Sequence, residues 1–198
     1  MSRLIESIKL LDGKYFNLSY HNQRMNNSLV DLYGTKEPFN LEEFLPSLGF
    51  TKKGLYKCRV IYDDGTKHVE FVPYASQSID TLKIVEDNSI VYPHKFKDRG
   101  RIDRAFGKRE GCDDILIIKN NLVTDSSYSN VVFKKSGNWF TPESPLLPGT
   151  MRQRLLDKGL IKAEVIRKED IETFDCFKLI NAMLGFEGPE VPIKNIIF

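Results

Sequence analysis

The sequence has few cysteines and histidines, and it has no long apolar run. Its three cysteines, Cys58, Cys112 and Cys176, are far apart and odd in number, which excludes a disulfide framework and a CxxC zinc site. The three histidines are equally scattered, so no metal site is expected. No run reaches the roughly 18 apolar residues that a transmembrane helix needs. Cysteines in this pattern are typical of a reducing compartment, so we expect a cytoplasmic protein.

The chain also lacks an excess of charge of either sign. It has 29 Lys and Arg against 27 Asp and Glu, which gives a net charge of +2. Domains that bind nucleic acid or an anionic membrane are usually clearly basic, so neither partner is expected. The first apolar residues include Glu6 and Asp12 and no small-residue cleavage signal, which argues against a secretory peptide. A chain of 198 residues, 41% of them hydrophobic, is long enough to bury a substantial core.

Short strand and helix patterns alternate along the chain and predict an α+β protein. A hairpin is expected around Asp12-Gly13, followed by a helix over residues 20–33 that Gly34 ends. The uniformly apolar run at 114–118 indicates a buried strand. Short hairpin connections favour largely antiparallel pairing and exclude a doubly wound parallel sheet.

The polar, turn-rich residues 86–89 are interpreted as a linker. The sequence therefore predicts two domains, a small N-terminal α/β domain at 1–88 and a larger C-terminal domain at 89–198. In the second domain we expect a helix over 99–108 and another that follows Pro148-Gly149 and runs to Lys158.

Three segments have side chains or amides suited to a ligand, and each also has a plain structural interpretation. The basic tract 95–101 either belongs to a site or is the solvated start of a helix. The polar cluster 124–130 lies between apolar strands and is either a turn or a buried loop that presents hydroxyls and amides. In 147–152 a glycine opens a helix whose free amides suit phosphate, although most helix starts bind water. No P-loop, GxGxxG, GxSxG or HExxH motif accompanies them.

Taken in order, segments over nearly the whole chain resemble the fold-type IV pyridoxal-phosphate (PLP) enzymes. These include branched-chain aminotransferase, D-amino acid aminotransferase and 4-amino-4-deoxychorismate lyase. The resemblance implies a two-domain α+β fold similar to D-amino acid aminotransferase, with PLP as the cofactor bound by the C-terminal domain. The segments are Leu4–Ile8 (the family's FET strand), His21–Arg24 with Ser28 (its HxxR…S helix), Lys95–Arg99 (the lyase's K-x-x-N-R), Val123–Phe133 (ITEGSxSNxF), Trp139–Pro142 and Leu147–Arg152 (lyTP…lLpGitR) and Leu179–Met183 (TNAL).

The resemblance implies that Lys95 is the catalytic residue, which binds the aldehyde of PLP and later moves protons. Lys97 is the competing lysine, but it lacks the Asn/Asp-Arg pair at the family's offset. Asp125 stands where the family has Glu, the carboxylate that keeps the ring nitrogen protonated. Because Asp is one methylene shorter, it must approach the ring more closely or act through water.

Further cofactor contacts follow from the same resemblance. Arg24 matches the family's phosphate arginine, and we expect its side chain to be exposed on the helix. The amides of Thr150 and Met151 match the family's helix-start contacts with the phosphate. Ser127 and Ser129 are either neighbours of the cofactor or members of a core turn.

The substrate and the reaction are less specified than the cofactor. Asn181 and Ala182 match a loop through which some members bind the substrate carboxylate. The K-x-x-[N/D]-R form favours a lyase similar to 4-amino-4-deoxychorismate lyase, which removes pyruvate and leaves p-aminobenzoate. A class IV aminotransferase acting on a branched-chain or D-amino acid shares every cofactor contact and is the alternative. A non-catalytic paralogue is a further alternative.

Only Met1, Ser2 and Arg3 precede the strand that resembles FET, so we expect a shortened N-terminus and an abbreviated small domain relative to the family. This shortening affects the shape of the substrate pocket rather than PLP binding. The family also implies a homodimer that acts on a small amino-acid-like substrate.

Overall fold

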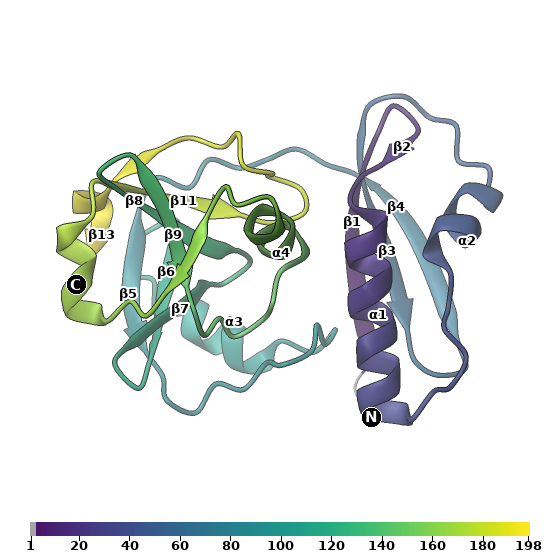
Figure 1. The fold of residues 1–198 in the computed structure, drawn as a ribbon, viewed down its shortest axis with the longest axis horizontal. Helices are drawn as coiled ribbons and strands as arrows, with labels where there is room; N and C mark the ends of the chain where they lie inside the picture. Colours follow the sequence, from purple (N-terminus) through teal and green to yellow (C-terminus); the bar gives the residue numbers. More distant parts are fainter. Residues whose placement is uncertain (1–2) are drawn as a thin grey trace. The chain divides into compact units, whose positions relative to one another are not determined.

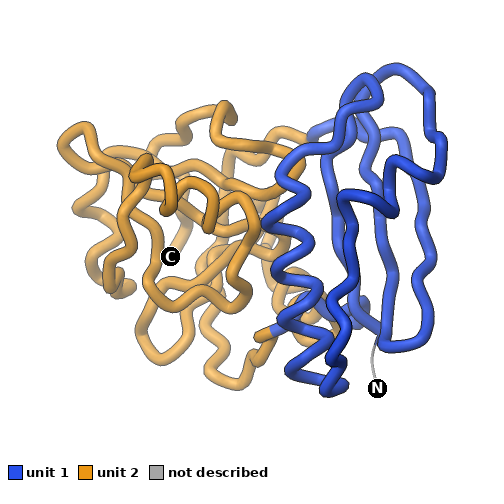
Figure 2. The backbone as a smooth tube through the Cα atoms, turned by 45° about the vertical axis from the view of Figure 1, so that its right-hand side comes forward, with its two compact units in different colours: residues 1–76, 94–98 blue, residues 77–93, 99–198 orange. Residues whose placement is uncertain are grey.

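The structure is a computed structural model of the chain and describes residues 3–198; Met1 and Ser2 lie outside the described residues. The chain forms two compact units. Unit 1 is the chain up to Ser76 together with His94–Asp98, and unit 2 is Gln77–Pro93 together with Arg99–Phe198 (Figure 2).

Unit 1 is an antiparallel four-stranded sheet, in the order β2-β1-β3-β4, with two helices (Figure 1). Apolar residues from alternate positions of β1 pack against Met25 and Leu29 of the long helix α1, and these side chains form one core. The elements of unit 1 are β1 (Leu4–Leu11), β2 (Lys14–Tyr15), α1 (Leu18–Tyr33), α2 (Leu41–Ser47), β3 (Leu55–Tyr62) and β4 (Lys67–Pro73).

The predicted hairpin and the helix after it are confirmed. Asp12 and Gly13 have φ of 49° and 80°, the left-handed backbone that a two-residue turn of this kind requires. Helix α1 begins at Leu18, two residues before the predicted start, and Gly34 ends it with a φ of 66°.

Residues 94–98 pack in unit 1 although the chain on both sides of them packs in unit 2. The amide of Ile5 donates to Lys95 O at 2.9 Å, and Leu4 forms an isolated bridge with Phe96. The compact units therefore do not coincide with the domains at 1–88 and 89–198, which stay a prediction. Residues 86–89, interpreted as a linker, lie inside unit 2, where the amide of Asp87 donates to Ile118 O at 3.0 Å.

Unit 2 is a mixed sheet in the order β10-β9-β8-β7-β6-β5-β13, with β11 paired to β8 and to β12. Most neighbours are antiparallel, as expected, but β5 pairs in parallel with β6 and β13, and β9 pairs in parallel with β10. The strands are β5 (Leu82–Glu86), β6 (Asp114–Lys119), β7 (Leu122–Ser126), β8 (Asn130–Lys135), β9 (Asn138–Pro142), β10 (Lys162–Glu164), β11 (Cys176–Ile180), β12 (Val191–Pro192) and β13 (Ile196–Ile197).

The helices of unit 2 are short: α3 (Gly100–Phe106), α4 (Thr150–Asp157), and the 3-10 turns η1 (Lys168–Thr173) and η2 (Ile193–Asn195). The apolar run in β6 is buried as predicted. The first part of the polar cluster is not a turn, because residues up to Ser126 belong to strand β7. Within residues 3–198, no helix has the length and apolarity to cross a membrane.

Candidate functional site

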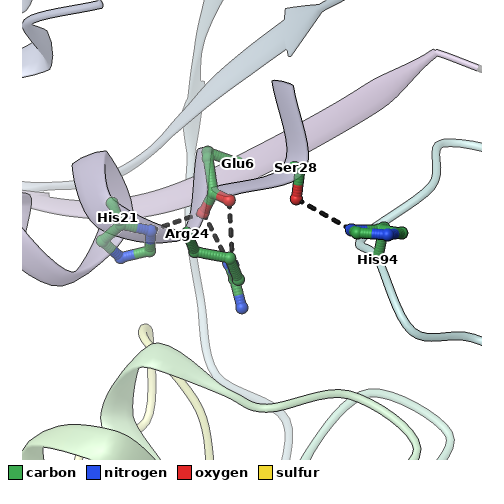
Figure 3. Close-up of polar contacts among 5 residues, drawn as sticks. All are labelled: Glu6, His21, Arg24, Ser28 and His94. Atoms are coloured by element: carbon green, nitrogen blue, oxygen red, sulfur yellow. Dashed lines mark hydrogen bonds and ion pairs between the residues drawn. The ribbon is translucent and has the colours of Figure 1, made fainter. Parts of the chain in front are cut away.

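Unit 1 contains a buried ionic cluster between β1 and α1. Glu6 of β1 is fully buried, and its carboxylate accepts hydrogen bonds from Arg24 Nε at 2.9 Å and Arg24 Nη2 at 2.5 Å. His21, one turn before Arg24 on α1, contacts the same carboxylate through Nδ1 at 2.6 Å. Figure 3 shows both α1 side chains converging on Glu6. The cluster fixes the orientation of the Arg24 guanidinium, because two of its nitrogens bind one rigid acceptor.

The charges of this cluster are strongly coupled. Burial opposes ionisation of Glu6, but Arg24 and His21 outweigh it and lower the pKa of Glu6 to about 2. Burial lowers the pKa of His21, and Glu6 offsets only part of this effect. At neutral pH the cluster therefore holds an ionised Glu6, a cationic Arg24 and a neutral His21 that donates its Nδ1 proton.

The expected exposure of Arg24 is wrong. Its side chain is only 16% exposed, because it lies along α1 and pairs with a carboxylate in the core. The alternation of β1 contains the signal that could have revealed this pair. Glu6 has the same parity as Leu4 and Ile8, which are core residues, and a buried carboxylate needs a cationic partner.

Lys95 lies in the segment 94–98, which forms hydrogen bonds with β1 and α1. Its carbonyl accepts from Ile5, the neighbour of Glu6 on β1. The preceding His94 places Nδ1 3.1 Å from Oγ of Ser28 on α1, also drawn in Figure 3. The charge of Lys95 contributes to the lowered pKa of His21. The structure thus brings the predicted lysine into the same unit as the predicted phosphate arginine.

In unit 2, Asp125 is a buried carboxylate near the end of β7. Its Oδ1 accepts from Asn130 Nδ2 at 2.7 Å, and its Oδ2 accepts from the amide of Leu147 at 2.9 Å. Burial raises the pKa of Asp125 to about 6, although the donors Leu147 and Asn130 and the charge of Arg152 favour its ionised form. Sequence reasoning missed Asn130 as the partner of this carboxylate.

The turn after β7 contains an unpaired buried hydroxyl. Ser127 Oγ has no hydrogen-bond partner in the described part of the chain, while the carbonyl of Ser127 accepts from Arg99 Nη2 at 2.6 Å. The Arg99 guanidinium also lies over the ring of Tyr128, 3.6 Å from its centroid. Arg99 therefore stabilises the turn that contains Ser127 through these two contacts.

Ser129 and Asn181, two predicted site residues, lie together in unit 2. Asn181 Nδ2 donates to Ser129 Oγ at 2.9 Å, and Asn181 Oδ1 accepts from the amides of Met183 and Leu184. The Oδ1 end of the Asn181 side chain thus holds the turn that includes Ala182, and the Nδ2 end binds Ser129 between β7 and β8. A substrate contact of this segment would fall to its backbone.

The start of α4 supplies amides without a side-chain cap. The N-cap is Gly149, which has no side chain, and the buried Thr150 and Met151 form the first positions of the helix. Thr150 and Met151 therefore begin a helix, as the sequence predicts, and their contact with a phosphate stays a prediction. Predicted cofactor residues thus occur in both units, with Lys95 and Arg24 in unit 1 and the others in unit 2.

The polar groups of unit 2 fit two features of PLP, its cationic ring nitrogen and its anionic phosphate. A carboxylate has about four acceptor sites, and Asn130, Leu147 and the nearby amide of Leu146 account for three of those of Asp125. Among residues 3–198 no donor takes the fourth site, which a ring N–H would use. The unpaired Ser127 hydroxyl is a donor that lacks an acceptor. No group of three or more potential metal-binding side chains occurs within residues 3–198.

Comparisons with known proteins identify relatives over most of the chain. Residues 100–195 match the family described as amino-transferase class IV. A protein of Haemophilus influenzae with no described function is 37% identical over 187 residues, which are 93% of this chain and 100% of that protein. A candidate aminodeoxychorismate lyase of Schizosaccharomyces pombe is 31% identical over 87 residues, which are 41% of this chain and 37% of that protein.

Solved structures of other proteins are also similar to this chain over most of its length. The crystal structure of a candidate 4-amino-4-deoxychorismate lyase from Haemophilus somnus is 34% identical, with a TM-score of 0.89 over 94% of this chain and 98% of that one. A candidate amino-acid aminotransferase from Mesorhizobium loti is 19% identical, with a TM-score of 0.80 over 97% and 98% of the two chains. The second likeness shows the shared fold alone.

Proposed function

Because this chain belongs to the aminotransferase class IV family of fold-type IV PLP enzymes, we propose that it is a PLP-dependent lyase that eliminates pyruvate from an aminated chorismate-like substrate. The product of this reaction is p-aminobenzoate. The observation that carries PLP dependence is the buried Asp125 carboxylate, which is held by neutral donors and keeps an acceptor site. The likeness to a candidate lyase over 98% of that chain supports the lyase assignment.

Each predicted residue has one role in this proposal. Lys95 binds the aldehyde of PLP and moves protons, and Asp125 holds the proton on the ring nitrogen. Arg24, oriented by Glu6, binds the phosphate as a fixed cation. PLP, when bound, supplies the electron sink for the reacting carbon.

Further donors complete the proposed set. Ser127 and Ser129 contribute hydroxyls, and the amides of Thr150 and Met151 face the phosphate. Asn181 and Ala182 are assigned to the substrate carboxylate through the backbone of their turn. The homodimer and the cytoplasmic location expected from the resemblance stay predictions.

Borohydride reduction followed by peptide mapping tests the proposal. The purified protein should be yellow and should lose that colour on reduction. The peptide that contains Lys95 should then carry the reduced pyridoxyl group. A protein that binds no PLP would contradict enzymatic function and favour the non-catalytic paralogue.

The alternative activity is that of a class IV aminotransferase, which the family match favours. The two activities separate on incubation with L- or D-alanine in the absence of a keto acid. An aminotransferase converts its bound cofactor stoichiometrically to the pyridoxamine form and stops, which is visible as a change in the absorbance spectrum. We expect the lyase to keep its spectrum, and the conversion would contradict the proposed elimination.

A further inference from the structure

The Asn130 side chain connects two parts of unit 2 that the proposed function assigns to cofactor binding. Its Nδ2 donates one hydrogen bond to Asp125 Oδ1 at 2.7 Å and another to Leu147 O at 2.9 Å. The amide of Leu147 donates in turn to Asp125 Oδ2 at 2.9 Å. These three bonds form a closed ring. Asn130 is 6% exposed and Asp125 is 5% exposed, so bulk water has little access to replace a lost bond.

The other end of the Asn130 amide lies against the start of α4. A Cβ added at Gly149, the N-cap of this helix, would lie 2.0 Å from Asn130 Oδ1 and 3.1 Å from its Cγ. The backbone of Gly149, with φ of −73° and ψ of 142°, is open to any residue. Glycine is therefore needed here for space and not for conformation. It allows Asn130 to reach Asp125 and Leu147 at the same time.

We propose that Asn130 is a positioning residue that holds the Asp125 carboxylate in place and joins it to residues 147–149, the segment that leads into α4. The consequence for PLP rests on the proposed function. In that function Asp125 meets the ring nitrogen, and the first amides of α4 meet the phosphate. One side chain would then set the spacing between the two contacts.

The electrostatics of Asp125 follow from the same contacts. A donor directed at a buried carboxylate stabilises its ionised form, and Asn130 is the side-chain donor in the ring. Arg152 of α4 is the charged group that acts on Asp125 in the same direction. Without Asn130, only the amides of Leu147 and Leu146 and the charge of Arg152 counteract the effect of burial. The pKa of Asp125 should therefore rise further.

Titration of the Asp125 carboxyl in the PLP-free protein tests the proposal without activity. The variants are Asn130→Ala, which removes the donor, and Gly149→Ala, which displaces it. Asp125→Asn identifies the carbon-13 signal of the carboxyl. We expect the pKa of Asp125 to rise by about 1 or more in both variants, because each loses a hydrogen bond to the ionised carboxylate.

Matched controls separate this effect from loss of an amide or of a glycine in general. Asn138→Ala removes an exposed amide that donates to Ser136 O at 3.2 Å. Gly188→Ala adds a Cβ whose nearest neighbour, Leu179 O, is 3.9 Å away. Both controls should leave the pKa of Asp125 unchanged. If Asn130→Ala does not fold, Gly149→Ala carries the test, because it keeps every polar group of the ring.

The PLP affinity of the same variants gives a second readout by equilibrium dialysis. We expect the dissociation constant to rise about tenfold or more in Asn130→Ala and Gly149→Ala and to stay constant in the controls. An Asp125 pKa that is unchanged in folded variants overturns the proposal, as does unchanged affinity for PLP. A parent protein that binds no PLP contradicts the proposed function, while the titration still decides the role of Asn130.

Discussion

Arg24 and Glu6 form a two-point ion pair in the core of unit 1, with Nε 2.9 Å from Oε1 and Nη2 2.5 Å from Oε2. Both of these bonds come from the Nε edge of the guanidinium. The pair is therefore an orienting device for Arg24 as well as a stabilising contact. It makes Arg24 a residue on which both the fold and the proposed phosphate contact depend.

Replacing Arg24 with Ala should therefore destabilise the protein as well as weaken PLP binding. The variant leaves the Glu6 carboxylate buried without its cation, which typically costs about 3–5 kcal/mol. Urea unfolding followed by circular dichroism measures the loss in the PLP-free protein. Arg59→Ala is the matched control, because Arg59 pairs with Glu70 at 2.9 Å on the same sheet with both side chains about one third exposed. The control should lose no more than about 1 kcal/mol, and an equal loss in both variants would contradict this account of Arg24.

Glu6 should make the stability of the protein fall in acid. Its pKa of about 2 in the fold lies below the ordinary value of 4.5, so folding favours its ionised form. That contribution is complete above pH 4.5 and is lost as the pH falls toward 2, with a total of about 3 kcal/mol. The acid-induced loss of unfolding free energy should be smaller in Glu6→Gln than in the parent by this amount. Parallel pH profiles of the two proteins would show that Glu6 does not titrate in this way.

The local elements of this fold follow from local sequence signals. The turn and the helix end need left-handed backbone, which Asp12 and Gly13 adopt at the turn and Gly34 adopts at the helix end. Strand partners are different, because β5 and β6 pair in parallel through a connection of 27 residues that no short pattern specifies. Strand β7 was not predicted, because its buried residues Thr124, Asp125 and Ser126 are of types that are common in turns.

In the candidate site, too, residues within a motif could be predicted and their distant partners could not. Lys95 and Asp125 could be proposed from their motifs, because the family has a lysine and a carboxylate at the matching positions. Their partners could not, because Arg24 lies 18 residues from Glu6, and Leu147 lies 22 residues from Asp125. Such contacts depend on which elements pack together, and this is decided by tertiary structure. The exposure of Arg24 was mispredicted for the same reason.

Lys95→Ala should abolish covalent attachment of PLP. The variant lacks the amine that binds the aldehyde, whereas the proposed phosphate contacts remain, so non-covalent binding should persist. Borohydride reduction followed by mass spectrometry measures the label. Lys97→Ala is the matched control, because Lys97 lies two residues away with an exposed side chain. A full amount of attached pyridoxyl group in Lys95→Ala, or its loss in Lys97→Ala, would assign the attachment to Lys97 instead.

Asp125→Asn should lower turnover more than affinity for PLP. The variant keeps the size of the side chain but removes the negative partner of the ring nitrogen, which matters most when the reacting carbon carries negative charge. Steady-state kinetics and equilibrium dialysis on the same preparation separate the two effects. Unchanged turnover would remove the ring-nitrogen role from Asp125.

Asp125→Glu introduces the residue that the family usually has at this position, and the structure predicts that it is harmful here. The Asp125 oxygens already lie 2.7 Å and 2.9 Å from their donors, and the residue is buried. An extra methylene must push the carboxylate into Asn130 and Leu147 or displace the start of α4, and such overpacking typically costs about 1–3 kcal/mol. We expect lower stability in urea, weaker PLP binding and lower turnover. Asp157→Glu, at the exposed end of α4, is the matched control and should change none of them. Turnover at or above that of the parent would instead show that the site accommodates the longer carboxylate, and that the closed ring of hydrogen bonds around Asp125 is not what sets its position.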